Sequence, residues 1–300
     1  MQIFLQQLVN GLAWGSIYGL IALGYTMVYG VLQLINFAHG DIYMIGAMAG
    51  FYLGGYAVSG TTSSLFQFIL VMSGSMIICG LLGFLIERLA YRPLRAAPRL
   101  TALITAIGVS LFLQFGGQLV FGPDPKVFPE FFQTESLFRA GSVSLNNIQV
   151  IIFVVAILIA LLLRFLVMNT RIGMAMRAVS FSHPASKLMG IPINRIISFT
   201  FVLGSMLAAI AGVLVGISNP KVDPLMGIMP GLKAFVAAVL GGIGNIPGAL
   251  LGGLMIGVCE SMVVGYFSST YRDAIAFVIL ILVLLFRPQG LLGSKTVEKV

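Results

Sequence analysis

Three polar side chains that could bind a ligand or move a proton stand close together in LINFAHGDIYM (34–44). They are Asn36, His39 and Asp41, in a chain that has only two His and nine acidic residues. A histidine and a carboxylate at this spacing could belong to a metal site, a proton relay or a polar solute site. Zinc sites require three or four protein ligands, and no further ligand residue is in reach. We therefore expect neither a metal nor any other cofactor here.

The elements around this stretch are membrane segments. The 300-residue chain is 59% apolar and only 9% charged, with a mean hydropathy of +1.05. An average soluble domain has about 25% charged residues, so a soluble fold could not cover this much apolar surface. The basic residues behind the formal charge of +8 cluster in loops between apolar runs. They therefore indicate a membrane protein and not a nucleic-acid-binding protein. The composition predicts a multi-pass, all-α membrane protein with lipid as its surroundings.

Eight or nine membrane segments are expected, because a spanning helix needs about 20 mostly apolar residues. The long stretch Leu232–Tyr266 is interrupted by GGIGNIPG (241–248), where Gly and Pro make a continuous helix improbable. We expect one transmembrane domain over residues 1–300 and no removed leader. The spans are Phe4–Tyr29, Ile42–Val58, Leu65–Ile86, Leu100–Phe121, Val150–Met168, Ile196–Ile217, the two arms of Leu232–Tyr266, and Ala274–Phe286.

The Lys and Arg residues predict the orientation. Twelve of the 17 lie around loops 87–99 and 169–195 and in the tail 287–300. The positive-inside rule places these segments in the cytoplasm. Loops Gly122–Asn147 and Ser218–Pro230 then lie outside, as does the N-terminus.

The opening stretch allows two interpretations. In the first it is a turn, in which Asn36 and His39 bond loop backbone and Asp41 caps a helix that starts at Ile42. In the second the break dips into the membrane and lines a translocation path. A charged Asp at the bilayer centre costs about 2.5–3.5 kcal/mol on insertion scales, so Asp41 faces protein, water or the membrane edge.

GGIGNIPG is a second interruption, at a similar distance before a basic stop in the other half of the chain. Interrupted segments in matching places of two halves indicate a binding site in transporters. Amides around Gly242, Gly244 and Asn245 could then face a translocation path and bind a carboxylate. A tight hairpin turn near the inner face is the alternative.

Glu260, in GVCESMVVG, is the other acid inside an apolar run. Intramembrane acids are functional candidates by default. The alternatives are a polar contact with another helix or an interfacial position. Lys233 is expected to extend outward from its span end, and Arg272 and Asp273 are expected at the interface.

Small residues recur every four positions, as in Gly11, Gly15 and Gly19. This spacing forms a groove along one helix face and allows close helix packing in lipid. The other sets are Gly46, Gly50 and Gly54; Ala208, Gly212 and Gly216; and Gly244, Gly248 and Gly252.

The basic loop Asn169–Arg195 is patterned. Ser182 or His183 can cap a short helix with Pro184 in its first turn, and Gly190 is placed to end it. Such a helix would expose Leu188 and Met189. This pattern favours docking on a cytoplasmic partner, with a plain basic loop as the alternative.

No catalytic motif is present: the sequence has no GxxxxGK[ST] phosphate loop, HExxH or GxSxG. We expect a transport protein and not an enzyme. If ATP drives it, a separate chain must hydrolyse the ATP.

Six segments in order along the chain carry a family resemblance: INFAHGDIYMIGA (35–47), IERLAYRPLR (86–95), TRIGMAMRAV (170–179), KLMGI (187–191), AAVLGGIGNIPGALLGG (237–253) and LLFRPQGLLG (284–293). Together they resemble the LivH-type permease subunit of branched-chain amino acid ABC importers.

The resemblance implies a bacterial inner-membrane importer of leucine-type amino acids. Its partners would be a LivM-type second permease, two cytoplasmic ATPase subunits and a periplasmic amino-acid-binding protein. The patterned loop would be the coupling helix, with Arg177, Ala185, Lys187, Leu188, Met189 and Gly190 as its residues. Importer permeases often carry a Glu-Ala-Ala pattern there, and this chain has HPASKLMGI without the Glu. A urea or short-amide importer permease and a stand-alone transporter or channel remain as alternatives.

Overall fold

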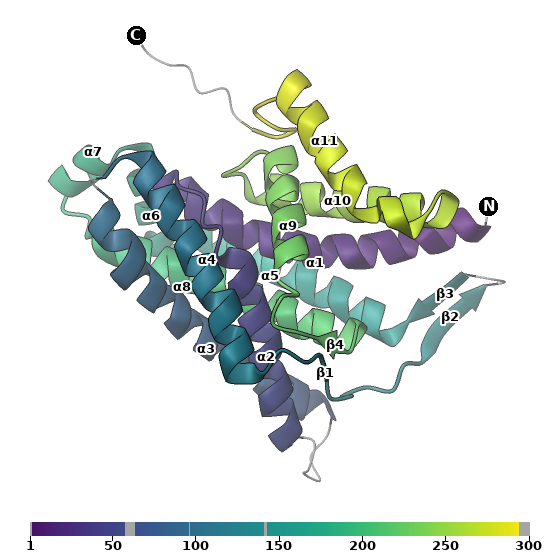
Figure 1. Ribbon diagram of the computed structural model, residues 1–300. Helices are drawn as coiled ribbons and strands as arrows, with labels where there is room; N and C mark the ends of the chain where they lie inside the picture. Colours follow the sequence, from purple (N-terminus) through teal and green to yellow (C-terminus); the bar gives the residue numbers. More distant parts are fainter. Residues whose placement is uncertain (1, 58–63, 96, 141–142, 294–300) are drawn as a thin grey trace.

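The computed structural model describes residues 2–57, 64–95, 97–140 and 143–293. Most of the described chain is helical, and Figure 1 shows the helices as one bundle. The helices are α1 (Gln2–Leu32), α2 (His39–Ala57), α3 (Ser64–Ile86), α4 (Arg99–Phe121), α5 (Asn147–Asn169), α6 (Arg171–Phe181), α7 (His183–Leu188), α8 (Ile193–Ser218), α9 (Ile228–Gly241), α10 (Ile246–Tyr266) and α11 (Arg272–Phe286). Short turns η1 (Glu87–Tyr91) and η2 (Arg92–Leu94) follow α3, and η3 (Ser269–Tyr271) precedes α11.

The strands are short. β1 (Lys126–Val127) pairs antiparallel with β4 (Lys221–Val222), and β2 (Ser136–Ala140) pairs antiparallel with β3 (Val143–Asn146).

Seven helices in the described residues are long and apolar enough to cross a membrane: α1, α3, α4, α5, α8, α10 and the α11 segment. The 19-residue α2 and the 14-residue α9 add two apolar helices to these seven. The predicted polytopic, all-α class is confirmed. Each of the two added helices adjoins a chain break: α2 follows the first break and α9 precedes the second.

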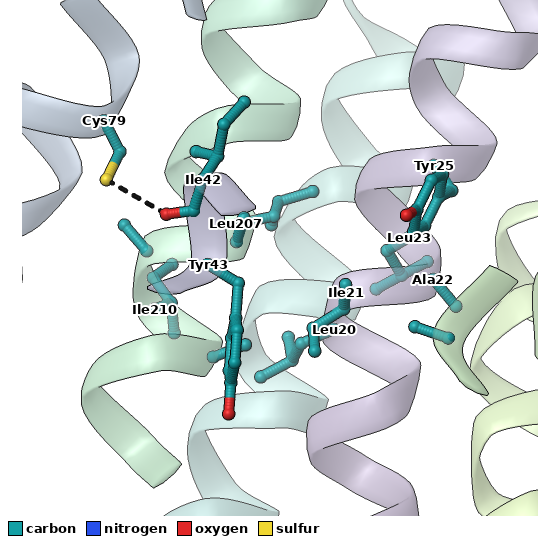
Figure 2. Close-up of a cluster of buried hydrophobic side chains, with 14 of the residues drawn as sticks. Leu20, Ile21, Ala22, Leu23, Tyr25, Ile42, Tyr43, Cys79, Leu207 and Ile210 are labelled. Atoms are coloured by element: carbon teal, nitrogen blue, oxygen red, sulfur yellow. Dashed lines mark hydrogen bonds between the residues drawn. The ribbon is translucent and has the colours of Figure 1, made fainter. Parts of the chain in front are cut away.

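Helices α1 and α8 form the centre of the bundle. Most of the spanning part of each is buried, 89% for α1 and 83% for α8, against 6% for α11. The central helices are apolar on all faces because they pack against protein on all faces. Figure 2 shows Leu20 and Ile21 of α1 on the side of Tyr43 of α2 and Leu207 and Ile210 of α8, whereas Ala22 points to the opposite side of α1. Cys79 of α3 is buried there, and its Sγ lies 3.5 Å from the carbonyl oxygen of Ile42.

The small-residue groove on α1 is a real packing face. A Cβ at Gly11 would lie 2.6 Å from Cα of Val258, and one at Gly15 would lie 2.7 Å from Cα of Leu254. Helices α1 and α10 can therefore approach this closely only because no side chain separates their backbones. The fourth predicted set is wrong, since Gly244 lies before α10 and has a positive φ of 95°.

The N-terminal ends of α2 and α9 meet inside the bundle. A Cβ at Gly40 would lie 2.6 Å from the carbonyl oxygen of Gly227 and 2.9 Å from Cα of Gly231. The prediction that all of Ser218–Pro230 is an outer loop is therefore wrong, because its last residues enter the bundle. We call the contact of Gly40 with Gly227 and Gly231 the α2–α9 junction.

GGIGNIPG does interrupt the chain as predicted, since α9 ends at Gly241 and α10 begins at Ile246. The segment after α11 lies against this turn. Leu291 N–H donates to the carbonyl of Leu240 at 2.8 Å, and the Asn245 Nδ2 amide donates to the carbonyl of Leu292 at 2.8 Å. The turn is therefore at the end of the bundle where the chain leaves α11, and not at the α2–α9 junction.

The described basic segments gather at one end of the bundle. Arg95, after η2, donates to Asn194 Oδ1 at 2.7 Å, and the imidazole of His183 lies 3.2 Å from the carbonyl oxygen of Val31. At the other end, Ser144 of β3 donates its amide to Gln6 of α1 at 2.7 Å. Figure 1 shows α7 at one end, at the upper left, and the N-terminus with β2 and β3 at the other. This arrangement agrees with the predicted separation of inner and outer loops; tail residues 294–300 lie outside the described residues.

Candidate functional site

The first break is tied to its neighbours by side chains. Asn36 is buried, and its Oδ1 accepts a hydrogen bond of 2.9 Å from the hydroxyl of buried Tyr91 in η1. This bond fixes the segment between α1 and α2 against the turn that follows α3.

His39 occupies the first position of α2 and is only 1% exposed. Its ring lies edge-on to that of Tyr25, with centroids 4.7 Å apart. The side chain fits because residue 24 is glycine: a Cβ there would overlap the imidazole. Its Nε2 has no hydrogen-bond partner among the described residues. Buried polar atoms are nearly always paired, so this nitrogen is an exception among the buried polar groups of the described protein.

Asp41 lies in the first turn of α2, which begins three residues earlier than predicted. Its carboxylate accepts hydrogen bonds from Ser110 Oγ at 2.5 Å and from Gln114 Nε2 at 3.0 Å, both on α4. The prediction of a cap for a helix starting at Ile42 is therefore wrong. The cost of a carboxylate in the bundle is offset here by donors from a neighbouring helix.

The turn interpretation is not supported at the level of side chains. The side-chain partners of Asn36 and Asp41 lie on η1 and α4 and not in the loop itself. The three residues brace α2 against three different elements next to the α2–α9 junction.

Glu260 of α10 belongs to a second polar group, which joins α9, α10 and α11. Its Oε1 lies 2.9 Å from Lys233 Nζ of α9 and also pairs with Arg272 of α11. Lys233 pairs in turn with Asp273 at 2.5 Å. We call Lys233, Glu260, Arg272 and Asp273 the charged cluster. Two cations and two carboxylates leave it formally neutral.

Aromatic rings of α1 complete this cluster. The Arg272 guanidinium lies 5.1 Å from the centroid of the Trp14 ring, and Lys233 Nζ lies 5.8 Å from that of Tyr18. Lys233 is only 3% exposed, so the prediction that it extends outward is wrong. The second carboxylate oxygen of Glu260 has no partner among the described residues. Arg272 and Asp273 are partly exposed, as expected for a span end.

Gly242, Gly244 and Asn245 form the turn between α9 and α10. A hollow of about 10 Å³ between the end of α1 and α9 reaches from Tyr25 to Ile243 beside this turn. Its lining includes Tyr25, whose ring contacts His39, and Ile243 of the second break. That volume holds at most one water, so no amino acid fits in this conformation.

The patterned loop folds as predicted. The Ser182 hydroxyl caps α7 by accepting the amide of Ala185 at 3.3 Å, and Gly190 ends the segment with a positive φ of 77°. Leu188 is 89% exposed and Met189 is 81% exposed. Arg177, Ala185, Lys187 and Gly190 are exposed as well. In the described protein nothing covers this apolar pair.

Several residues of these sites were missed from sequence. The sequence pattern predicts no ionic partner for Lys233 and no role for Tyr25, Ser110 or Gln114. Their only sequence signal is a polar group within an apolar run, which names no partner. The described residues contain no group of three or more His, Cys, Asp or Glu side chains that could hold a metal ion.

The chain is similar to known proteins over nearly its whole length. The family described as branched-chain amino acid transport system / permease component matches residues 7–284. The chain is 46% identical to the high-affinity branched-chain amino acid transport system permease protein BraD of Pseudomonas aeruginosa, over 99% of this chain and 98% of that protein. It is 43% identical to LivH of Escherichia coli K12 over the same shares.

A more distant likeness is to the ribose import permease protein RbsC of Haemophilus influenzae, with 26% identity over 62% of this chain and 59% of that one. No solved structure matches. Because the family match and the relatives above 40% identity extend over nearly the whole chain, the protein belongs to the permease family of branched-chain amino acid transport systems.

Proposed function

We propose that the chain is the membrane-spanning subunit of an ATP-driven importer of branched-chain amino acids. One observation carries the ATP-driven part: α7 is a capped helix at the basic end of the bundle, with Leu188 and Met189 almost fully exposed. The chain has no phosphate loop of its own. An exposed apolar pair is suited to a groove on a partner that hydrolyses ATP. The substrate follows from the names of the relatives.

The proposed assembly has four kinds of subunit and resides in the bacterial inner membrane. This chain pairs with a second, LivM-type permease, and α7 of this chain docks on one of two cytoplasmic ATPases. A periplasmic binding protein delivers the amino acid to the outer end, where β1–β4 and β2–β3 lie. The exposed pair Leu188 and Met189 at the end of α7 and the exposed outer faces of α3, α4 and α11 support a chain that works inside a larger assembly.

The translocation path in this proposal passes the α2–α9 junction. His39 presents a buried, unpartnered nitrogen there, and Asn36 and Asp41 hold the start of α2 in place. From the junction the path follows the narrow hollow beside Tyr25 and Ile243 to the turn at Gly242, Gly244 and Asn245. Glu260 and its cluster hold α9 through Lys233, close to the junction residue Gly231. The path is closed in this conformation, since the hollow admits no amino acid.

Movement of α7 opens the path. ATP binding draws the ATPases together, and α7 moves with its docking groove. Helices α6 and α8 adjoin α7 and transmit this displacement to the centre of the bundle, which changes between packed states. The amino acid released by the binding protein enters from the outside, and ATP hydrolysis resets the pair.

Reconstitution of the full assembly in liposomes tests the proposal. We expect leucine uptake that requires ATP, all four kinds of subunit and an intact α7. Leu188→Asp with Lys187→Glu places two new negative charges on the docking helix, and we expect it to abolish uptake and ATPase binding. Both side chains are exposed, so the bundle should fold normally.

Lys221→Glu provides the matched control, because it reverses an exposed charge at the other end of the bundle. It should leave ATPase binding unchanged. Uptake by this chain without ATPases would contradict the proposal in favour of a stand-alone transporter. Uptake of urea or acetamide in place of leucine would support the importer function but contradict the proposed substrate.

A further inference from the structure

A basic cavity lies behind α7, on the side away from Leu188 and Met189. It has a volume of about 660 Å³ and opens between the end of α1, η2, α7 and the start of α8. Five of its lining residues are basic: Arg92, Arg95, His183, Lys187 and Arg195. The remaining wall is mainly aliphatic, from residues such as Leu32, Leu34 and Ile193.

One of these cations is neutralised by the protein. Arg95 pairs with Glu87, whose second oxygen accepts a hydrogen bond of 2.6 Å from Ser198. Glu87 is fully buried and is occupied by these two partners. Burial lowers the pKa of Arg95, as does its neighbour Arg92, while Glu87 raises it. The Nε of Arg95 is buried and has no hydrogen-bond partner among the described residues.

Arg92, Lys187 and Arg195 have no protein carboxylate beside them in the described structure. Three uncompensated cations around one hollow repel one another and create a positive potential that an anion would relieve. Arginine guanidinium groups are well matched to phosphate oxygens.

We propose that this cavity binds a phosphate group, namely the headgroup of an anionic phospholipid. The wall of basic and aliphatic side chains favours a phospholipid over free phosphate. Basic residues face the hollow beside aliphatic side chains, which would contact the glycerol and the first carbons of an acyl chain. Basic pockets between membrane helices on the cytoplasmic side are suited to such headgroups. Free phosphate shares the charge but gains nothing from the aliphatic wall.

Lipid in this cavity would fix α7 against the bundle, since His183 and Lys187 belong to α7 and the other basic residues do not. Anionic lipid would then strengthen the coupling between α7 and the helices behind it. This consequence, unlike binding itself, rests on the proposed role of α7.

Native mass spectrometry of the full-length chain in detergent tests binding directly. Cardiolipin, phosphatidylglycerol and phosphatidylcholine are added in turn. We expect adducts with the two anionic lipids and few with phosphatidylcholine. Arg92→Gln with Arg195→Gln should weaken anionic lipid binding by about fivefold for each cation removed, or roughly 25-fold together.

The matched control is Arg164→Gln with Arg171→Gln. It removes the same charge from exposed positions on α5 and α6 that do not line the cavity. We expect its lipid binding to stay within about twofold of the parent chain. Melting temperatures in neutral detergent, equal for both variants and the parent, show that folding is intact.

Three results would overturn the proposal. Equal loss of lipid in both double variants would mean a general surface charge effect. Displacement of lipid by inorganic phosphate or glycerol phosphate at similar concentrations would assign the cavity to a soluble anion. If Arg92→Gln with Arg195→Gln kept the lipid but lost ATPase binding, the cavity would hold an acidic protein segment.

Discussion

At the residue scale, the described protein hides several polar groups that an apolar bundle would be expected to exclude. Each has partners from a different helix: Asp41 from α4, Asn36 from η1, and Glu260 from α9 and α11. Removing one partner of a buried pair is more costly than replacing both, because the remaining charge loses its compensation. The charged cluster therefore stabilises the contact of α9, α10 and α11 only while all of its charges are present.

Glu260→Gln tests this point. It leaves Lys233 and Arg272 with Asp273 as the one remaining carboxylate of the charged cluster, and we expect the free energy of unfolding to fall by up to about 3 kcal/mol. Adding Lys233→Met to it should restore part of this loss. Unfolding in mixed micelles followed by circular dichroism measures both effects.

Glu130→Gln is the control for that measurement. Glu130 is exposed and has no ion pair among the described residues, so its loss should change stability by less than about 0.5 kcal/mol. Equal stabilities of the Glu260→Gln and Glu130→Gln proteins would show that the charged cluster contributes nothing to folding.

At the element scale, close backbone contacts and broken helices determine the arrangement. Helices α1 and α10 touch through glycines, and α2 and α9 begin at a common point where Gly40 faces Gly227 and Gly231. In lipid, van der Waals packing of this kind replaces the hydrophobic effect as the main source of helix association. These interfaces therefore tolerate even a methyl group poorly.

Gly15→Ala should disrupt the α1–α10 interface. Its new Cβ would lie 2.7 Å from the Leu254 backbone, so the helices must separate, and overpacking of this kind costs about 1–3 kcal/mol. Thermal unfolding in detergent would record the loss.

Gly108→Ala makes the same chemical change on α4, where a Cβ has open space around it. Because alanine has a higher helix propensity than glycine, we expect no loss of stability there. A Gly15→Ala protein as stable as the Gly108→Ala protein would mean that α1 and α10 are not packed through their glycines.

At the scale of the whole molecule, charge and apolar surface are separated in space. The exposed outer faces of α3, α4, α5 and α11 carry many large apolar side chains, such as Phe112, Leu161 and Leu285. The described basic loops gather at one end, and β1–β4 and β2–β3 lie at the other (Figure 1). An exposed apolar belt between two polar ends is the form required of a membrane-embedded protein.

Cysteine labelling in intact cells tests this orientation. In a chain with Cys79 and Cys259 replaced by Ala, we introduce either Lys221→Cys or Arg177→Cys, both at exposed positions. A membrane-impermeant maleimide should label residue 221 from outside and residue 177 only after the membrane is opened.

Both cysteines should react equally in detergent, which controls for intrinsic reactivity. Labelling of residue 177 from outside in intact cells would reverse the orientation, and with it the assignment of α7 to the cytoplasmic face.

The sequence by itself determined the class of the protein and its local features. Composition predicts the membrane, the distribution of Lys and Arg predicts which loops share an end, and Gly and Pro predict the interruption at 241–248. Ser182, Pro184 and Gly190 predict α7 to within about a residue. These inferences succeed because each depends on neighbouring residues or on summed hydrophobicity.

The tertiary structure alone decided which helices meet. Lys233 pairs with Glu260, 27 positions away, and Asp41 pairs with Ser110, 69 positions away. The start of α2 meets the start of α9, where Gly40 lies against Gly227. In a bundle whose central helices are apolar on every face, the pattern of one helix does not name its neighbour. Packing of small residues and the pairing of buried charges make that choice.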